Sequence, residues 1–425
     1  MSSSDPVAPA AGVTDPDGAA HAPTAWFTPG VRGIGAASFL ADVGHEIPTA
    51  LLPSLLTTTL GAPAAALGLI EGIADGLAGA ARLAGGALAD DPARRRAVAV
   101  GGYSSTAVLS ALLGIAGAVW QVGVLRGAAW AARGLRVPAR NALLADIVPA
   151  AAYGRAYGFE RMMDNLGAVG GPLLALLLVS ALGVRTAILL SVVPGLLAAL
   201  AIVYAIRQIA RPTVRTHQPF RIKLRPVLRG DLGRLMVGVG AFELGNVAAT
   251  LLILRATQLL APSLGPQGAT QLALTLYIGY NVAATLASLP AGRLGDRWGT
   301  LAILTAGVAL FGLAYLGLAV GAASLGLLGA SFIAAGVAIG CVETAEHSAV
   351  AALAPVDLRG SAFGLLATVQ GFGNLAASAI AGALWTALSG QAAFLYLAAW
   401  MLVSLVALLT LGRLHTRRAS ARPSA

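Results

Sequence analysis

Long apolar stretches recur along almost the whole chain, and they constrain its fold more than any other feature. Each can form a helix of about 20 residues, which is the length that crosses a ~30 Å hydrocarbon core. Inside lipid the backbone must satisfy its own hydrogen bonds, so continuous apolar runs predict helices, whereas a barrel would need alternating residues. Hydrophobic residues make up 57% of the 425 residues and charged residues 11%, a composition far from that of soluble proteins. We therefore expect an all-α membrane protein.

Twelve such stretches are predicted, and one polar segment over 210–234 divides them into two sets of six. The predicted spans lie near residues 33–58, 64–88, 97–119, 121–146, 155–181, 184–207, 233–260, 269–291, 300–321, 324–351, 359–386 and 391–412. The domains expected from them are a flexible tail over 1–31, an N-terminal bundle over 32–208, a linker over 209–232, a C-terminal bundle over 233–413 and a tail over 414–425. The first tail has no apolar core of a signal peptide.

Arginines collect on one set of connections and predict the orientation of the chain. Arg94 to Arg96, the 210–234 segment, Arg293 and Arg297 all fall on the same side, which the positive-inside rule assigns to the cytoplasm. We expect a monomer in the inner or plasma membrane, with both termini cytoplasmic. The formal net charge of +10 is then a topology signal, and no basic and aromatic surface pattern indicates nucleic-acid binding.

The two halves of the chain are copies of each other. A shift of 206 positions lays Pro149 on Pro355, Gly154 on Gly360 and Gly158 on Gly364 without a gap. The same shift lays GALADDPAR, from Gly86, on GRLGDRWGT, from Gly292. Repeated six-helix halves are typical of secondary transporters, whose substrate site lies near the midplane between them.

The segment GRLGDRWG, from Gly292 to Gly299, resembles a loop motif of the major facilitator superfamily. This resemblance covers all twelve spans, and it implies two six-helix bundles that work by alternating access. It also implies a cytoplasmic gate, in which carboxylates beside arginines and helix ends latch the halves together. The gate residues implied are Gly86, Asp90, Arg94, Asp146, Gly292, Asp296 and Arg297.

The fifth predicted span carries spaced glycines that are similar to a pattern of exporters that exchange substrate for protons. The pattern comprises Gly158, Gly167, Gly171 and Pro172, while Ala175 and Leu176 replace its closing glycine pair. The alternative is that small residues simply let two helices pack closely.

Ionisable residues interrupt several spans at mid-membrane depth. Asp42, His45 and Glu46 fall within one arc of about 100° on the first span, and all three can face one cavity. The same spacing of three and four recurs in the tenth span, and further polar groups lie in spans four and seven. These residues are Glu343, Glu346 and His347 in span ten, Arg126, Arg133, Arg136 and Arg140 in span four, and Glu243 and Asn246 in span seven.

Each charge in hydrocarbon costs at least about 2.5 kcal/mol, so these groups should face the interior and pair with one another. In the family, Arg126 matches a buried arginine of the fourth helix. We expect Asp42 or Glu46 to exchange its proton as it gains and loses contact with Arg126 or Arg133. Glu243, Glu343 and Glu346 are the alternative proton carriers.

The pattern as a whole favours proton-coupled export of a small solute or drug-like compound. Two alternatives use the same fold: a transition metal bound by His45 and His347 with nearby carboxylates, or an organic anion bound by the arginines. A receptor or scaffold is a remote alternative because no soluble signalling domain is visible. Enzyme activity is not expected, since no nucleophile has a positioned base, and no cofactor is predicted. The sequence leaves the substrate, the direction of transport and the proton stoichiometry open.

Overall fold

The computed structural model describes residues 26–208, 221–321 and 324–420, without the side chains of 64, 65 and 411–420. Most of the predicted N-terminal tail, half of the predicted linker and the last five residues therefore lie outside the described residues. The N-terminal bundle contains α1 (Pro29–Ser54), α2 (Ala64–Ala89), α3 (Pro92–Leu112), α4 (Val119–Ile147), α5 (Tyr153–Leu190) and α6 (Val192–Arg207). The C-terminal bundle contains α7 (Leu224–Val227), α8 (Gly230–Glu243), α9 (Ala249–Trp298), α10 (Thr300–Val320), α11 (Leu325–Leu353), α12 (Arg359–Ala387) and α13 (Gly390–Ser420).

The helices supply the twelve crossings that the sequence predicts. Seven helical segments in the described part are long and apolar enough on their own, and two of these, of 58 and 50 residues, are long enough for two crossings each. Within them, Gly183 at φ 77° and Gly265 at φ 71° break α5 and α9. Glycine adopts these positive φ angles without the steric cost that a side chain would add. The remaining three crossings are α1, α2 and α4, whose charged residues make them less apolar, while α8 extends the crossing that the first part of α9 makes.

The seventh crossing is not the continuous helix expected over 233–260. Helix α8 ends at Glu243 and α9 begins at Ala249, with an unwound segment over 244–248. Side chains of the neighbouring helices replace the missing helical hydrogen bonds: Asn374 donates to the Asn246 carbonyl at 2.8 Å, and the Ala248 N–H donates to Ser378 at 2.9 Å. Unwound backbone within a membrane is tolerated only where such partners or a water-filled cavity satisfy it.

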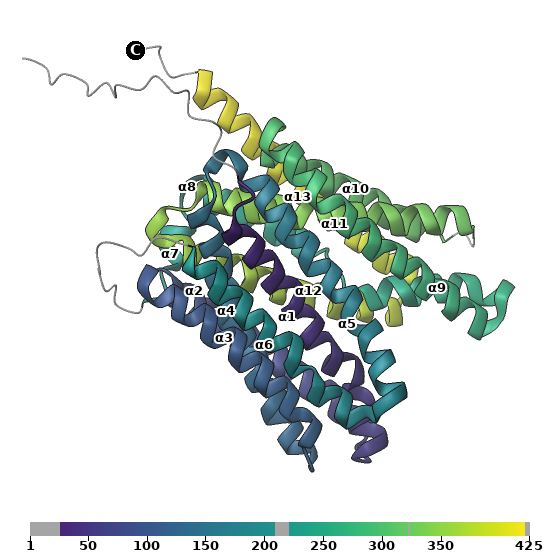
Figure 1. The fold of residues 1–425 in the computed structure, drawn as a ribbon. Helices are drawn as coiled ribbons and strands as arrows, with labels where there is room; N and C mark the ends of the chain where they lie inside the picture. Colours follow the sequence, from purple (N-terminus) through teal and green to yellow (C-terminus); the bar gives the residue numbers. More distant parts are fainter. Residues whose placement is uncertain (1–25, 209–220, 322–323, 421–425) are drawn as a thin grey trace, which may run out of the picture.

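The two bundles contact each other at one end and diverge at the other. Helix α5 packs against α9, and α2 packs against α12. Figure 1 shows the two sets of helices spreading apart away from the end where α13 terminates. We call the end at Asp90, Asp146 and Asp296 the closed end, and the end at Gly183 and Gly265 the open end.

Candidate functional site

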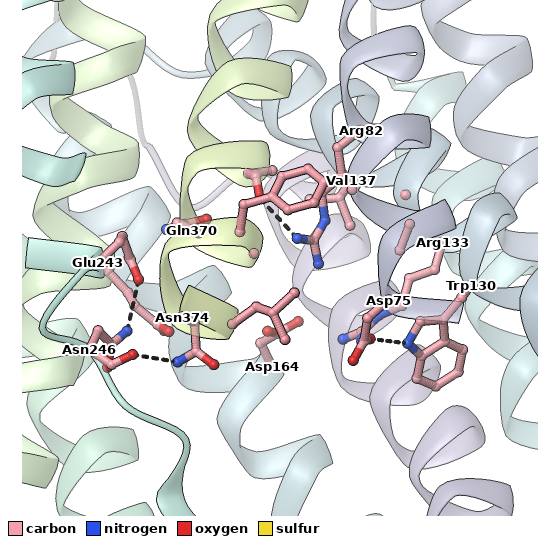
Figure 2. A pocket seen from close by; sticks show the side chains of 18 of the residues that line it. Asp75, Arg82, Trp130, Arg133, Val137, Asp164, Glu243, Asn246, Gln370 and Asn374 are labelled. Carbon is pink, nitrogen blue, oxygen red and sulfur yellow. Dashed lines mark hydrogen bonds between the residues drawn. The ribbon is translucent and has the colours of Figure 1, made fainter. Parts of the chain in front are cut away.

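A cavity of about 520 Å³ lies between the two bundles. Its volume falls within the range of pockets that hold small ligands, roughly 300–1,000 Å³. Helices α1, α2, α4 and α5 form one wall, and α8, α11, α12 and the unwound segment form the other. Figure 2 shows Asp75, Arg133 and Trp130 on one side of the pocket and Glu243, Asn246 and Asn374 on the other.

The three ionisable residues of α1 form a connected group. His45 Nδ1 lies 3.2 Å from Asp42 Oδ1, and His45 Nε2 lies 3.1 Å from Glu46 Oε1. Arg133 approaches Asp42 at 3.5 Å. Only Asp42 of the three lines the central cavity, although all three can face it by helical geometry. His45 instead borders a smaller space of about 10 Å³ between α1, α3, α4 and α6.

Arg133 contacts Asp42 as expected, but Arg126 and Arg140 of α4 pair with other acids. Arg126 binds Glu71 of α2 at 2.9 Å, donates to Thr49 at 3.1 Å and stacks on the Trp130 ring at 3.3 Å. It makes no hydrogen bond with Glu46 in the described structure. Arg140 binds Glu160 of α5 at 2.9 Å. The pairing therefore spreads over acids of α2 and α5 within the N-terminal bundle.

Among the described residues, Glu243, Glu346 and Glu343 of the C-terminal bundle form no ion pair with an arginine, lysine or histidine. Asn246 donates to Glu243 at 3.0 Å, and Gln370 donates to Glu346 at 2.9 Å. Within the described residues, the Glu343 carboxylate makes no hydrogen bond or ion pair. Burying a carboxylate without a cation is costly. These three side chains are thus suited to receive a proton or a cationic group.

The two histidines that a metal site would need lie in different surroundings. His347 donates to the Glu343 carbonyl at 2.7 Å and lies against the rings of Tyr157 and Phe363, whereas His45 bridges two carboxylates of α1. Among the residues that the structure describes, no group of three or more His, Cys, Asp and Glu side chains is arranged to hold a metal ion.

Some cavity residues were not singled out from the sequence. Asp75 and Arg82 of α2 line the wall, as do Gln370, Asn374 and Ser378 of α12. The spacing of each set in the sequence could have indicated it. Asp75 and Arg82 are seven residues apart in an apolar helix, and the α12 residues recur every four positions, so that each set shares one helix face.

At the closed end, two aspartates bind the N-termini of helices in the opposite bundle. Asp90 accepts hydrogen bonds from the Ser361 N–H at 2.8 Å and the Ser361 hydroxyl at 2.6 Å, in the first turn of α12. Asp296 accepts from the Gly154 N–H at 2.7 Å and the Arg155 N–H at 3.1 Å, in the first turn of α5. Unpaired first-turn N–H groups and the helix dipole favour an anion at this position. Burial raises the pKa of the Asp90 carboxyl above its usual value, against the two hydrogen bonds from Ser361.

The remaining gate residues fall into two classes. Asp146 joins Arg95 of its own bundle to Arg359 of the other, the latter at 3.3 Å. Gly86 and Gly292 allow close backbone contact: a Cβ on Gly86 would lie 2.6 Å from the Gly360 carbonyl oxygen. Arg94 and Arg297 do not reach the seam, since Arg94 pairs with Asp91 at 3.5 Å and Arg297 is exposed.

The glycines of α5 contact two different helices. A Cβ on Gly158 would meet the Ser288 carbonyl of α9, and one on Gly167 would lie 2.5 Å from the Phe39 carbonyl oxygen of α1. A Cβ on Gly171 would meet the Glu46 side chain of α1, while Pro172 is exposed. Gly167 and Gly171 therefore hold α5 directly against the acidic turn of α1.

Two known proteins resemble this chain in sequence. An uncharacterised MFS-type transporter of Methanocaldococcus jannaschii is 29% identical over 367 residues, covering 85% of this chain and 90% of the relative. An uncharacterised protein of Mycobacterium tuberculosis is 28% identical over 368 residues, covering 84% of this chain and 86% of that protein.

Two solved structures share the fold. The human organic anion transporter MFSD10 (TETRAN) has a TM-score of 0.66 and 17% identity, and covers 89% of this chain and 99% of its own. A bacterial homologue of the iron transporter ferroportin, in an outward-facing state, has a TM-score of 0.74 and 14% identity, with 90% and 99% coverage. The model of the Major Facilitator Superfamily matches residues 34–254 and 239–425. With both halves matched, this chain belongs to the Major Facilitator Superfamily and is a multi-pass membrane transporter of small molecules, not an enzyme.

Proposed function

We propose that the protein is a monomeric, proton-coupled exporter of the cell membrane that works by alternating access. The observation that carries this proposal is the cavity walled by both bundles, with hydrogen bonds across the seam at one end and diverging helices at the other. A substrate in this cavity would contact both bundles. Rocking of one bundle against the other would then change the end from which the cavity is reached.

The orientation of the closed end follows from charge. If the arginine-rich connections are cytoplasmic, the closed end faces the cytoplasm and the cavity opens outward in this conformation. An exporter reaches this state after releasing its substrate and binds protons there before it turns inward. The two structural relatives are named for organic anions and for iron, and the fold likeness alone does not choose between such substrates.

The groups that exchange the proton are proposed to be Glu243, Glu343 and Glu346. Asp42 and Glu46 already share His45, and Asp42 also has Arg133, so both have positive or hydrogen-bonding partners. Among the described residues, the three glutamates of the other bundle have amide hydrogen-bond partners at most. A proton is therefore the simplest way to neutralise them when substrate is absent.

Spin-label distances test alternating access and proton coupling together. After Cys341 is replaced by serine, one pair of labels at Thr58→Cys and Ser263→Cys reports the open end, and a second pair at Ala151→Cys and Trp298→Cys reports the closed end. All four sites are exposed. We expect the two distances to change in opposite directions between mildly acidic and mildly alkaline buffer, in purified protein in lipid nanodiscs.

Variants then locate the proton carrier. Because glutamine resembles a protonated glutamate in shape and charge, Glu243→Gln, Glu343→Gln or Glu346→Gln should hold the alkaline distances near the acidic ones. Asp42→Asn and Glu46→Gln should leave most of the pH response intact. If Asp42→Asn or Glu46→Gln abolishes the pH response instead, the α1 carboxylates are the proton carriers. If neither label pair moves with pH, proton-coupled alternating access is wrong.

A further inference from the structure

The two walls of the central cavity carry opposite charge. The N-terminal bundle contributes five arginines and three aspartates to the lining, whereas the lining from the C-terminal bundle contains two glutamates and, among described residues, no lysine or arginine. Figure 2 shows this division, with Arg82 and Arg133 on the side away from Glu243. The cavity is thus electrically polarised across the seam between the bundles.

Part of the positive wall is free to bind a ligand. The Arg140 and Arg161 guanidinium groups are occupied by Glu160 and Asp164. The Arg133 side chain is 30% exposed, and its one ion pair, with Asp42, is long at 3.5 Å. Arg82 donates one hydrogen bond, to the Ala367 carbonyl at 2.9 Å. Since a guanidinium has five N–H donors, Arg133 and Arg82 keep several for an acidic group.

The glutamates of the negative wall also have unused hydrogen-bond acceptor capacity. Glu243 receives one hydrogen bond, from the Asn246 amide, and Glu343 receives none in the described structure. Both line the cavity. An anionic substrate would leave these carboxylates without a counter-charge, and a simple cation would leave Arg133 with only its long contact to Asp42. A ligand with a single charge therefore pairs with the charged side chains of one wall and leaves those of the other wall without a partner.

We propose that the substrate is a zwitterionic small molecule, whose acidic group binds Arg133 and Arg82 and whose amine binds Glu243 and Glu343. This inference rests on the proposed function and names its substrate class. A zwitterion links the two bundles through both charges and so stabilises closure of the cavity around it. Its amine also competes with protons for the same glutamates, and this competition makes the transport an exchange.

Binding of matched probes to the purified full-length protein tests the substrate class. The probes are γ-aminobutyrate and ε-aminocaproate, with caproate and hexylammonium as the monofunctional analogues and caproamide as the neutral control. Calorimetry should give at least about tenfold tighter binding for one of the two zwitterions than for either analogue, because a second charge-assisted contact adds at least that much. Equal or tighter binding of caproate or hexylammonium would overturn the proposal.

Variants assign each charge to its wall. Glu243→Gln or Glu343→Gln should remove the advantage of the zwitterion over caproate while keeping its advantage over hexylammonium. Arg133→Gln should do the reverse, and Arg133→Lys should restore part of the loss. Asp357→Asn and Arg293→Gln, at exposed positions outside the cavity, are the matched controls and should bind as the wild type does.

The outcomes separate this inference from the proposed function. If the spin-label distances respond to pH but the zwitterions bind no better than their analogues, the substrate class is wrong and proton-coupled exchange stands. If zwitterions bind selectively while the distances stay fixed, the cavity is a zwitterion site and the transport mechanism is wrong.

Discussion

At the scale of single residues, interior charged side chains that share a spacing pattern in the sequence have different partners. Asp42 and Glu343 lie at comparable places in repeated patterns, yet Asp42 is held by His45 and Arg133, and Glu343 faces the cavity without a partner in the described structure. The two aspartates of the repeated loop motif, in contrast, make the same kind of contact. Asp90 and Asp296 each bind the first turn of a helix in the other bundle.

A pair of substitutions at Asp90 separates hydrogen bonding from charge. Burial raises the pKa of this carboxyl. In Asp90→Asn the amide oxygen can still accept from the Ser361 N–H, and the amide NH₂ can donate to the Ser361 hydroxyl. Asp90→Ala leaves a buried N–H without an acceptor, which should weaken the closed end by about 1–3 kcal/mol. The distance between labels at Ala151→Cys and Trp298→Cys should lengthen in the alanine variant and stay near wild type in the asparagine variant. Equal opening in both would show that the charge itself is required.

At the scale of helices, close packing and local unwinding bring the site together. Gly167 lets α5 contact the backbone of α1 beside Asp42, because no side chain stands between the two helices. The break between α8 and α9 has the opposite effect, since it frees the turn that follows Glu243 to face the cavity. Gln370, Asn374 and Ser378 of α12 give that turn its polar surroundings.

Adding a single methyl group tests the α1 contact. In Gly167→Ala the new Cβ would lie 2.5 Å from the Phe39 carbonyl oxygen and 2.8 Å from the Asp42 Cβ. The helices must separate, so we expect a loss of about 1–3 kcal/mol in stability and a lower unfolding temperature by scanning fluorimetry. Gly101→Ala on α3 is the control, because no atom lies within 4 Å of its Cβ; it should be neutral or slightly stabilising. An unchanged Gly167→Ala melting curve would contradict tight α1–α5 packing.

At the scale of the whole molecule, two similar bundles carry unlike charges into one cavity. The repeat explains the shared fold and the reciprocal helix-end contacts at the closed end. It does not extend to the cavity lining, where arginines come from one bundle and unpaired glutamates from the other. Because the two bundles share a fold but line the cavity with different side chains, each bundle can bind a different part of one substrate.

The orientation of this frame in the membrane can be checked by labelling. With Cys341 replaced by serine, a membrane-impermeant maleimide applied to intact cells should label Ser263→Cys at the open end. It should not label Ala151→Cys at the closed end until the cells are made permeable. This pattern follows from the arginines of the closed-end connections. Labelling of Ala151→Cys in intact cells would reverse the orientation and, with it, the proposed direction of transport.

Much of the fold could be predicted from the sequence because its causes act within short segments. Hydrocarbon thickness sets the length of each apolar run, and the 206-residue repeat links the two halves. The loop motif carries both Asp90 and Asp296, whose carboxylates accept from first-turn N–H groups of helices in the other bundle. The mid-membrane charges are visible for the same reason, since an ionisable group in lipid is costly enough to stand out.

The tertiary structure alone decided which of these charges meet. Helical periodicity places Asp42, His45 and Glu46 on one face, but the packing of α4 and α5 determines that only Asp42 reaches the central cavity. Arg126 pairs with Glu71, not Glu46, because distances between helices are set by packing across the bundle. The break after Glu243 and the opposite charges of the two walls also depend on residues far apart in the chain. Such contacts have no period or spacing in the sequence, so only the folded arrangement of the helices establishes them.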